Sequence, residues 1–167
     1  KINASIQNFL RKQKIKIARL LWDKKEKVNI SGEKLIEKNS INSILLLRDD
    51  GKIGDMVVSS FVYREIKKQY PNIKIGVVTR KGAIDIIKNN IYVDKIYEYK
   101  KSSGYLKKLA KEIAEEKYDL LIDTSTILRE KQIMFINKCK CRINLGVEKD
   151  NWGLFDVSIS EDSNAHI

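Results

Sequence analysis

The sequence predicts an α/β fold in which helices flank a doubly wound, mainly parallel sheet. Residues 43–48 (Ser-Ile-Leu-Leu-Leu-Arg) form a short continuous apolar run, which is typical of a strand buried on both faces. From there to residue 145, similar apolar runs alternate with amphipathic segments, as parallel strands alternate with crossover helices. A single proline and eight glycines argue against a collagenous or low-complexity chain.

The first expected element is a helix over residues 4–22. One apolar stripe at helical spacing is formed by Ile6, Phe9, Leu10, Ile17, Leu20 and Leu21. Most of the basic residues of this segment fall off that stripe: Arg11, Lys12, Lys14, Lys16 and Arg19. A basic amphipathic helix that ends in a tryptophan is able to lie in a membrane interface. Alternatively, the stripe packs on the domain or on a further domain, so we expect docking on protein or on an anionic membrane.

The remaining elements follow the charged segment 23–38. The expected strands are 43–48, 73–79, 94–99, 118–123 and 142–145, and the expected helices are 56–70, 82–89, 105–116 and 128–138. Within the first of these helices, Val57, Phe61 and Ile66 are expected to face inward, and Pro71 ends it. Ligands of doubly wound sheets bind beyond the carboxyl ends of the strands. A site is therefore expected among residues 48–55, 79–82, 99–104 and 123–126.

Basic residues outnumber acidic residues by 33 to 22, which gives a net charge of +11. Such a surplus favours anionic partners such as nucleic acid, anionic lipid or a phosphorylated substrate, although an AT-rich genome also produces a lysine-rich composition. No apolar run is long enough for a membrane-spanning helix, and no signal peptide is evident.

Cys139 and Cys141 are too close together for a usual zinc pair. We expect buried or idle thiols in a reducing, cytoplasmic setting.

The loop Arg48-Asp-Asp-Gly-Lys-Ile-Gly-Asp55 lacks both the dinucleotide fingerprint and a P-loop. Gly51 and Gly54 allow close backbone approach, and the helix start offers free N–H groups. The carboxylates of Asp49, Asp50 and Asp55 would repel a bare phosphate unless a divalent metal bridged them. A hydroxyl that loses its proton to a carboxylate fits better. Asp55 should stay ionised at the helix N-terminus, as a general base or as a simple cap.

Residues 44–60 (Ile-Leu-Leu-Leu-Arg-Asp-Asp-Gly-Lys-Ile-Gly-Asp-Met-Val-Val-Ser-Ser) resemble the opening of glycosyltransferase family 9, the ADP-heptose:lipopolysaccharide heptosyltransferases. The similarity continues through Arg64, Tyr70–Ile75, Asn89–Ile96, Tyr118–Asp123 and Arg142–Gly146. The resemblance implies one Rossmann-like half of a GT-B enzyme. It implies an acceptor-binding domain over residues 41–160, which would follow the basic amphipathic extension expected over residues 1–40. Residues 161–167 would begin a linker to a donor domain outside this sequence.

The resemblance also implies an inverting transfer of heptose from ADP-heptose to the lipopolysaccharide inner core. Asp55 matches the aspartate of the Gly-Asp pair that acts as catalytic base in the family. The expected acceptor-binding residues are Asp49, Asp50, Gly51, Lys52, Gly54, Arg80, Lys100 and Lys101. The basic members of this set would meet the anionic acceptor as charges. No cofactor or metal is implied. The donor partner would bind the missing domain, so the chain alone is expected to be inactive.

The resemblance implies a cytoplasmic protein. Peripheral association with the inner face of the bacterial inner membrane is an alternative location. A different class of function stays open: a non-catalytic module that binds anionic membranes or nucleic acid. Few aromatic residues interleave the lysines and no nucleic-acid motif is present, so no nucleic acid is expected as a partner. A third alternative is a nucleotide-binding domain that holds Mg²⁺ through Asp49 and Asp50. The segment Asp123–Thr126 is a further candidate to line the cleft.

Overall fold

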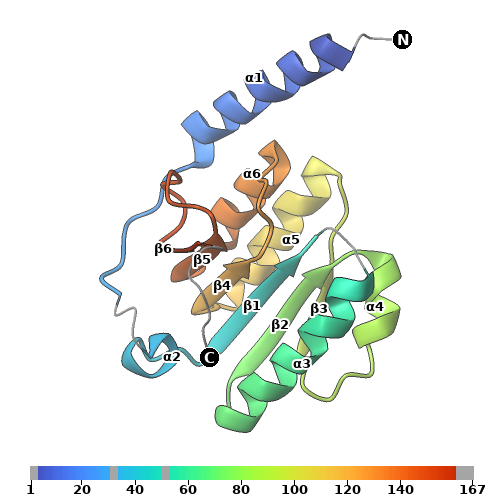
Figure 1. Ribbon diagram of the computed structural model, residues 1–167, viewed down its shortest axis with the longest axis vertical. Coiled ribbons are helices and arrows are strands. Elements are labelled where there is room, and N and C mark those ends of the chain that lie inside the picture. Colours follow the sequence, from blue (N-terminus) through green and yellow to red (C-terminus); the bar gives the residue numbers. More distant parts are fainter. Residues whose placement is uncertain (1–3, 31–33, 50–52, 161–167) are drawn as a thin grey trace.

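The computed structural model describes residues 4–30, 34–49 and 53–160, and its centre is one parallel sheet (Figure 1). All strand pairs are parallel, in the order β3-β2-β1-β4-β5-β6. The strands are β1 (Ser43–Arg48), β2 (Lys74–Thr79), β3 (Lys95–Glu98), β4 (Leu120–Asp123), β5 (Ile143–Val147) and β6 (Val157–Ile159). The predicted α/β class and parallel sheet are confirmed, with β1 in the interior of the sheet.

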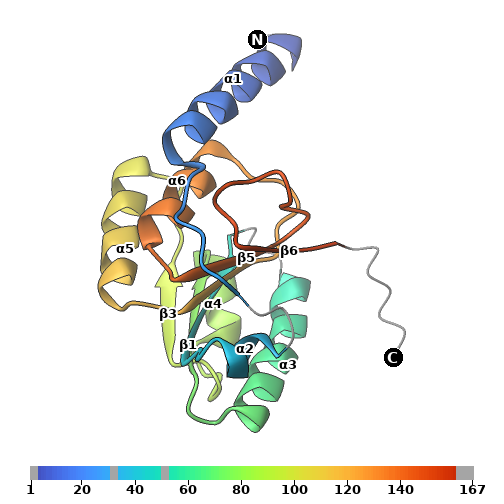
Figure 2. The same cartoon turned by 90° about the vertical axis from the view of Figure 1, so that its left-hand side faces the viewer.

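Helices cover both faces of this sheet. They are α1 (Ala4–Trp22), α2 (Leu35–Lys38), α3 (Ile53–Gln69), α4 (Lys81–Ile87), α5 (Ser103–Glu115) and α6 (Glu130–Cys139). Helices α3 and α4 pack on one face, and α5 and α6 pack on the other (Figures 1 and 2). Helix α1 contacts α6 and projects from the body of the domain at one end (Figures 1 and 2).

Alternate residues of β1 supply the two halves of the core. Leu45 and Leu47 belong to the apolar cluster under α5 and α6, whereas Ile44 and Leu46 belong to the cluster under α3 and α4. All four side chains are at most 5% exposed. Burial of such a side chain stabilises the fold by about 1.5–3 kcal/mol. The unbroken apolar run of this strand therefore reflects a sheet that is covered on both sides.

The inward face of α3 differs from the expected one. Val57 and Phe61 are about half exposed, at 47% and 53%, whereas Ser59 and Tyr63 are buried. Of the expected inward residues, Ile66 packs against the core. Apolar side chains occur all around this helix, so their spacing does not select one face. The small Ser59 faces the sheet because its hydroxyl accepts hydrogen bonds from Arg48.

The apolar stripe of α1 does not pack on the described domain. Its six members, Ile6, Phe9, Leu10, Ile17, Leu20 and Leu21, are all exposed. The helix instead contacts the domain through Ile15, Ala18 and Trp22, which join the core cluster under α6. The expectation that the stripe packs on this domain is therefore wrong. The side of α1 that packs is the one that carries Ile15, the small Ala18 and Trp22.

Two short elements, α2 and β6, were not expected from the sequence. β6 follows β5 in parallel through the loop 148–156, which contributes Leu154 and Phe155 to the core instead of forming a helix. The two cysteines are free and buried, as expected, and burial raises the pKa of both thiols, that of Cys141 to about 12. They are therefore protonated, unreactive core residues.

Candidate functional site

The order of the strands reverses between β1 and β4. The chain runs outward from β1 through β2 to β3, and then returns to the other side of β1 with β4. At such a reversal, the crossover connections diverge and leave a crevice at the carboxyl edge of the sheet. Polar residues follow the strands there: Asp49 follows β1, Arg80 follows β2, and Ser125 lies two residues after β4.

A crevice of about 650 Å³ lies at this edge, between the strand ends, α6 and α1. It is lined by Arg11, Ile15, Asp49, Arg80, Lys101, Ser125, Ile127, Leu128, Arg129 and Gln132. A smaller hollow of about 140 Å³ adjoins this crevice. The two share Asp49, Arg80, Lys101, Arg129 and Gln132, and the smaller one adds Tyr99, Glu130 and Lys131. Helix α1 therefore forms one wall of the crevice.

Four cationic side chains converge on the crevice: Arg11, Arg80, Lys101 and Arg129. They come from α1, from the loops after β2 and β3, and from the start of α6. Within the described part of the chain, Nε of Arg80 is buried and has no hydrogen-bond partner. Because buried polar groups are nearly always hydrogen-bonded, this atom is suited to an acceptor atom of a bound anion.

A hydrogen-bonded pair forms the floor of the crevice. Asp49 is 8% exposed, and its Oδ2 accepts a hydrogen bond of 2.7 Å from Nε2 of Gln132. Oε1 of Gln132 accepts a second bond, of 2.8 Å, from the backbone N–H of Arg129. The amide of Gln132 thereby fixes the start of α6 against the end of β1. The carboxylate of Asp49 is a structural anion below the four cations.

A second carboxylate, that of Asp123, is buried at the end of β4. Burial raises its pKa to about 6, although hydrogen bonds from Ser125 and the nearby Lys149 ammonium favour its charged form. Burial lowers the pKa of Lys149. Nζ of Lys149 donates hydrogen bonds to the backbone oxygens of Ser125 and Val147. This network holds the loop after β4, which contributes Ser125 to the crevice.

The predicted site residues are distributed unevenly around this crevice. Asp49, Arg80 and Lys101 line it. Lys100 lies outside its lining, because its Nζ is 3.2 Å from a carboxylate oxygen of Glu98 and lies over the Tyr105 ring.

The other predicted residues belong to the segment 50–55. Asp50, Gly51 and Lys52 lie outside the described residues. Gly54 is the second residue of α3, and open space surrounds the position where a Cβ would stand. Asp55 is the third residue of the helix, so its backbone lies in the first turn, as predicted. A carboxylate there benefits from the positive end of the helix dipole.

Sequence reasoning missed three polar lining residues that the fold brings to the crevice. Arg11 was assigned to the flank of an amphipathic helix, while Arg129 and Gln132 lie at the start of a helix that the pattern marks as ordinary. No local motif distinguishes them. Arg129 and Gln132 have a positional signal only, since the loop after β4 leads to the same sheet edge as the other loops, and Arg11 has none.

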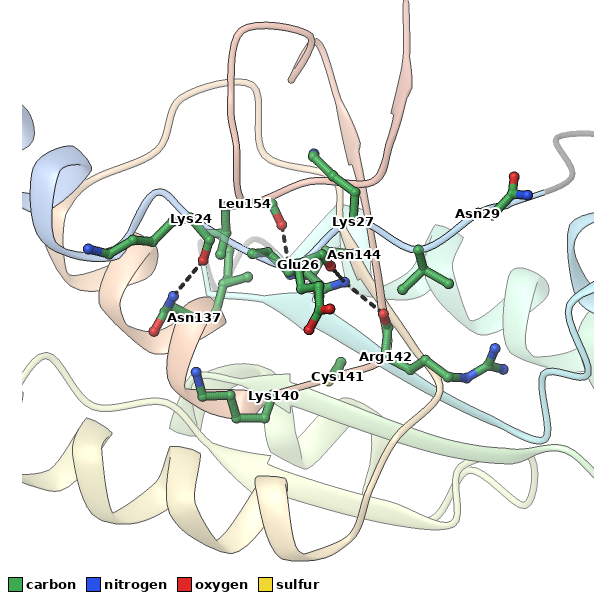
Figure 3. Close-up of a pocket in the computed structure, with 13 residues that line it drawn as sticks. Lys24, Glu26, Lys27, Asn29, Asn137, Lys140, Cys141, Arg142, Asn144 and Leu154 are labelled. Carbon is green, nitrogen blue, oxygen red and sulfur yellow. Dashed lines mark hydrogen bonds between the residues drawn. The ribbon is translucent and has the colours of Figure 1, made fainter.

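A larger crevice, of about 740 Å³, lies elsewhere, between the segment 24–29 and the start of β5 (Figure 3). Polar groups in it bind one another: Asn137 donates to the backbone oxygen of Lys24, and Lys25 donates to that of Arg142. These contacts tie the extension to the domain. Because the crevice lies at the amino end of β5, away from the carboxyl edge, we assign the functional site to the crevice beside β1 and β4.

Within residues 4–30, 34–49 and 53–160, no three His, Cys, Asp or Glu side chains form a group suited to a metal ion.

Comparisons with known proteins agree with this architecture. No protein-family model matches the chain. The chain is 28% identical over 144 residues to the Escherichia coli (strain K12) protein named "Putative lipopolysaccharide heptosyltransferase 4", covering 83% of this chain and 38% of that protein. It thus spans well under half the length of this curated relative.

Two solved structures share the fold. One is ADP-heptose lipopolysaccharide heptosyltransferase II of E. coli, with a TM-score of 0.57, 18% identity, and coverage of 70% of this chain and 34% of that one. The other is a family 9 glycosyl transferase from Veillonella parvula, with a TM-score of 0.55, 20% identity, and coverage of 63% and 31%. The chain is homologous to the N-terminal portion of the heptosyltransferases of glycosyltransferase family 9.

Proposed function

We propose that this chain is the acceptor-binding domain of an inverting glycosyltransferase that transfers heptose from ADP-heptose to the lipopolysaccharide inner core. The observation that carries the proposal is the convergence of four cationic side chains on one crevice at the carboxyl edge of the sheet. The relative similar over most of this chain is named for lipopolysaccharide heptosyl transfer. An inner-core acceptor bears carboxylates and phosphates, which match such a crevice in charge.

Arg80 and Arg129 are the proposed main contacts to the acceptor. A guanidinium presents donors in a planar fork that suits carboxylate and phosphate oxygens. Arg80 already has its Nε buried and free of partners within the described residues. Lys101 and Arg11 add charge from the rim. Asp49 supports the floor through Gln132, so we assign it a positioning role.

Asp55 is the proposed general base. Its carboxylate would take the proton of the attacking sugar hydroxyl as the hydroxyl oxygen bonds to the anomeric carbon of the donor. The bond from that carbon to the phosphate oxygen breaks, ADP leaves with the electron pair, and the anomeric configuration inverts. The dipole of α3 keeps Asp55 ionised before the reaction, which a base requires. The donor would be held by a further domain outside this sequence.

Calorimetric titration of the chain with deacylated, phosphorylated inner-core oligosaccharide tests the acceptor assignment. We expect binding that weakens about 10-fold or more in Arg80→Gln and in Arg129→Gln, because each removes a charge-assisted hydrogen bond. Arg64→Gln is the matched control, since Arg64 lies on α3 and pairs with Glu65 outside the crevice. Enzymatic removal of the phosphates from the oligosaccharide should weaken binding to the wild type.

Two results would contradict the proposal. One is equal affinity for the phosphorylated and dephosphorylated oligosaccharides. The other is tight, steeply salt-dependent binding of duplex DNA by a protein that binds no oligosaccharide, which would favour a nucleic-acid module instead.

A further inference from the structure

We propose that α1 docks the protein onto an anionic phospholipid bilayer, with the helix axis in the plane of the membrane surface. The docking surface is the stripe of exposed apolar side chains on α1, defined by Ile6, Phe9, Leu10, Ile17, Leu20 and Leu21. No described helix is both long and apolar enough to cross a bilayer, so the binding proposed is interfacial. This proposal is independent of the glycosyltransferase function.

The exposure of this stripe is large for a protein in water. Phe9 is 60% exposed and Leu20 is 78% exposed, and the other four members are between 47% and 56% exposed. Contiguous apolar surface of this kind marks an interaction site. Phe9, Leu20 and Ile17 lie within about one quarter of the helix circumference at 100° per residue, so they form a continuous strip.

The opposite side of α1 is fixed to the domain, which sets the direction of the stripe. Ala18 is 1% exposed, and Ile15 and Trp22 pack on the core beside α6. Arg19 donates a hydrogen bond to the backbone oxygen of Asn151, and its guanidinium lies 4.2 Å from the centre of the Trp152 ring. The stripe is centred about half a turn away from these contacts, so it faces away from them. The helix itself projects from the body of the domain (Figure 2).

The charge of α1 favours an anionic lipid surface as the partner of the stripe. Residues 4–22 contain five basic residues and no acidic residue. By helical position, Lys12 and Lys16 border the stripe on one side and Lys14 borders it on the other. This arrangement places ammonium groups at headgroup depth while the stripe enters the acyl boundary. A second copy of the chain would bring an equally basic helix, and the like charges would oppose that pairing.

Docking through α1 has a geometric consequence for the crevice at the sheet edge. Arg11 and Ile15, on the inner side of the same helix, line that crevice. A membrane-bound α1 would therefore hold the cationic crevice beside the lipid headgroups. A lipid-linked anionic ligand would reach it without leaving the bilayer.

Vesicle flotation of the full chain tests the proposal. The vesicles are phosphatidylcholine alone or phosphatidylcholine with about 30% phosphatidylglycerol. The stripe variant is Phe9→Ser/Ile17→Ser/Leu20→Ser, and its matched control is Val57→Ser/Val58→Ser/Phe61→Ser, which removes three exposed apolar side chains from α3. The charge variant is Lys12→Glu/Lys16→Glu, with Lys108→Glu/Lys111→Glu on the exposed side of α5 as its control.

The wild type should bind the anionic vesicles at least about 10-fold more tightly than the neutral ones. The stripe and charge variants should each lose about 10-fold or more, while both controls stay within about 2-fold of the wild type. Thermal unfolding followed by circular dichroism verifies that all variants are folded. Wild-type binding by the stripe variant overturns the proposal. So does a wild type that fails to float but forms a dimer that the stripe variant abolishes, since a second copy would then be the occupant.

Discussion

Gln132 of α6 donates a 2.7 Å hydrogen bond to the carboxylate of Asp49, which lies 83 residues earlier at the end of β1. Both side chains are buried. The same amide accepts a hydrogen bond from the backbone N–H of Arg129, whose guanidinium lines the crevice. One side chain therefore links the buried carboxylate of the floor to the position of a proposed ligand-binding arginine.

Replacing Gln132 with alanine should destabilise the protein by about 1.5–3 kcal/mol, because a hydrogen bond to a buried charged group is lost. Urea unfolding measures this loss. Gln132→Glu is the informative companion, since it sets a second carboxylate against Asp49 and should be more destabilising at pH 7 than at pH 5. An alanine variant as stable as the wild type would show that Asp49 does not depend on this bond.

Asp123 should make the stability of the fold depend on pH in a direction unusual for an aspartate. Its pKa is raised from 3.8 to about 6 in the folded protein, chiefly by burial. Between these values, the folded state binds more protons than the unfolded state, so stability falls as the pH rises. Two units of pKa correspond to about 3 kcal/mol.

Asp123→Asn removes this titration and provides the measurement. The free energy of unfolding of the wild type, minus that of Asp123→Asn, should decrease by up to about 3 kcal/mol from pH 4 to pH 7. Comparing the two proteins at each pH cancels the other carboxylates, including Glu116, whose pKa is lowered to about 2 by Lys74 and Lys95. A difference that does not change with pH would contradict the prediction.

Gly146 should not tolerate a side chain. A Cβ on this β5 residue would lie 2.5 Å from Cγ of Lys149 and 2.8 Å from carbons of the Phe155 ring. Gly146→Ala should therefore cost about 1–3 kcal/mol, since Lys149 and the loop 148–156 must shift. Gly82→Ala in α4, where no atom lies within 4 Å, is the control and should be neutral or slightly stabilising. Thermal unfolding of both variants measures the difference.

Local pattern was sufficient for those parts of the fold whose energetics are local. The apolar run of β1 gave a buried parallel strand, and the spacing in residues 4–22 gave α1 with its observed bounds. The inward face of α3 was not predictable, because its apolar residues surround the helix and Arg48 selects Ser59. β6 has three residues and no crossover helix before it, so it left no periodic signal.

The candidate site was predictable only where chain position alone leads to the sheet edge. Asp49, Arg80 and Lys101 follow strands, so the strand assignment located them. Arg11 reaches the same crevice through the packing of α1 on α6, and that tertiary contact has no sequence signature. Lys100 is directed away from the crevice by the ion pair that it forms with Glu98. The position of a lysine in the sequence does not show which carboxylate it pairs with in the fold.

The proposed role of Asp55 as a general base gives the sharpest mechanistic prediction. In the full-length enzyme, Asp55→Asn should lower the rate of sugar transfer about 10²–10⁴-fold, which is the usual contribution of a positioned general base. If Asp55 were only a helix cap, asparagine would replace it with little effect, because the two residues cap helices almost equally well. The substitution therefore separates the two roles at a position in the first turn of α3.

The measurement is transfer from ADP-heptose to an inner-core acceptor by wild type and variant, together with their melting temperatures. An unchanged melting temperature with a collapsed rate would assign Asp55 to the chemistry, whereas near-normal turnover would return it to the helix start and leave the base to be sought elsewhere.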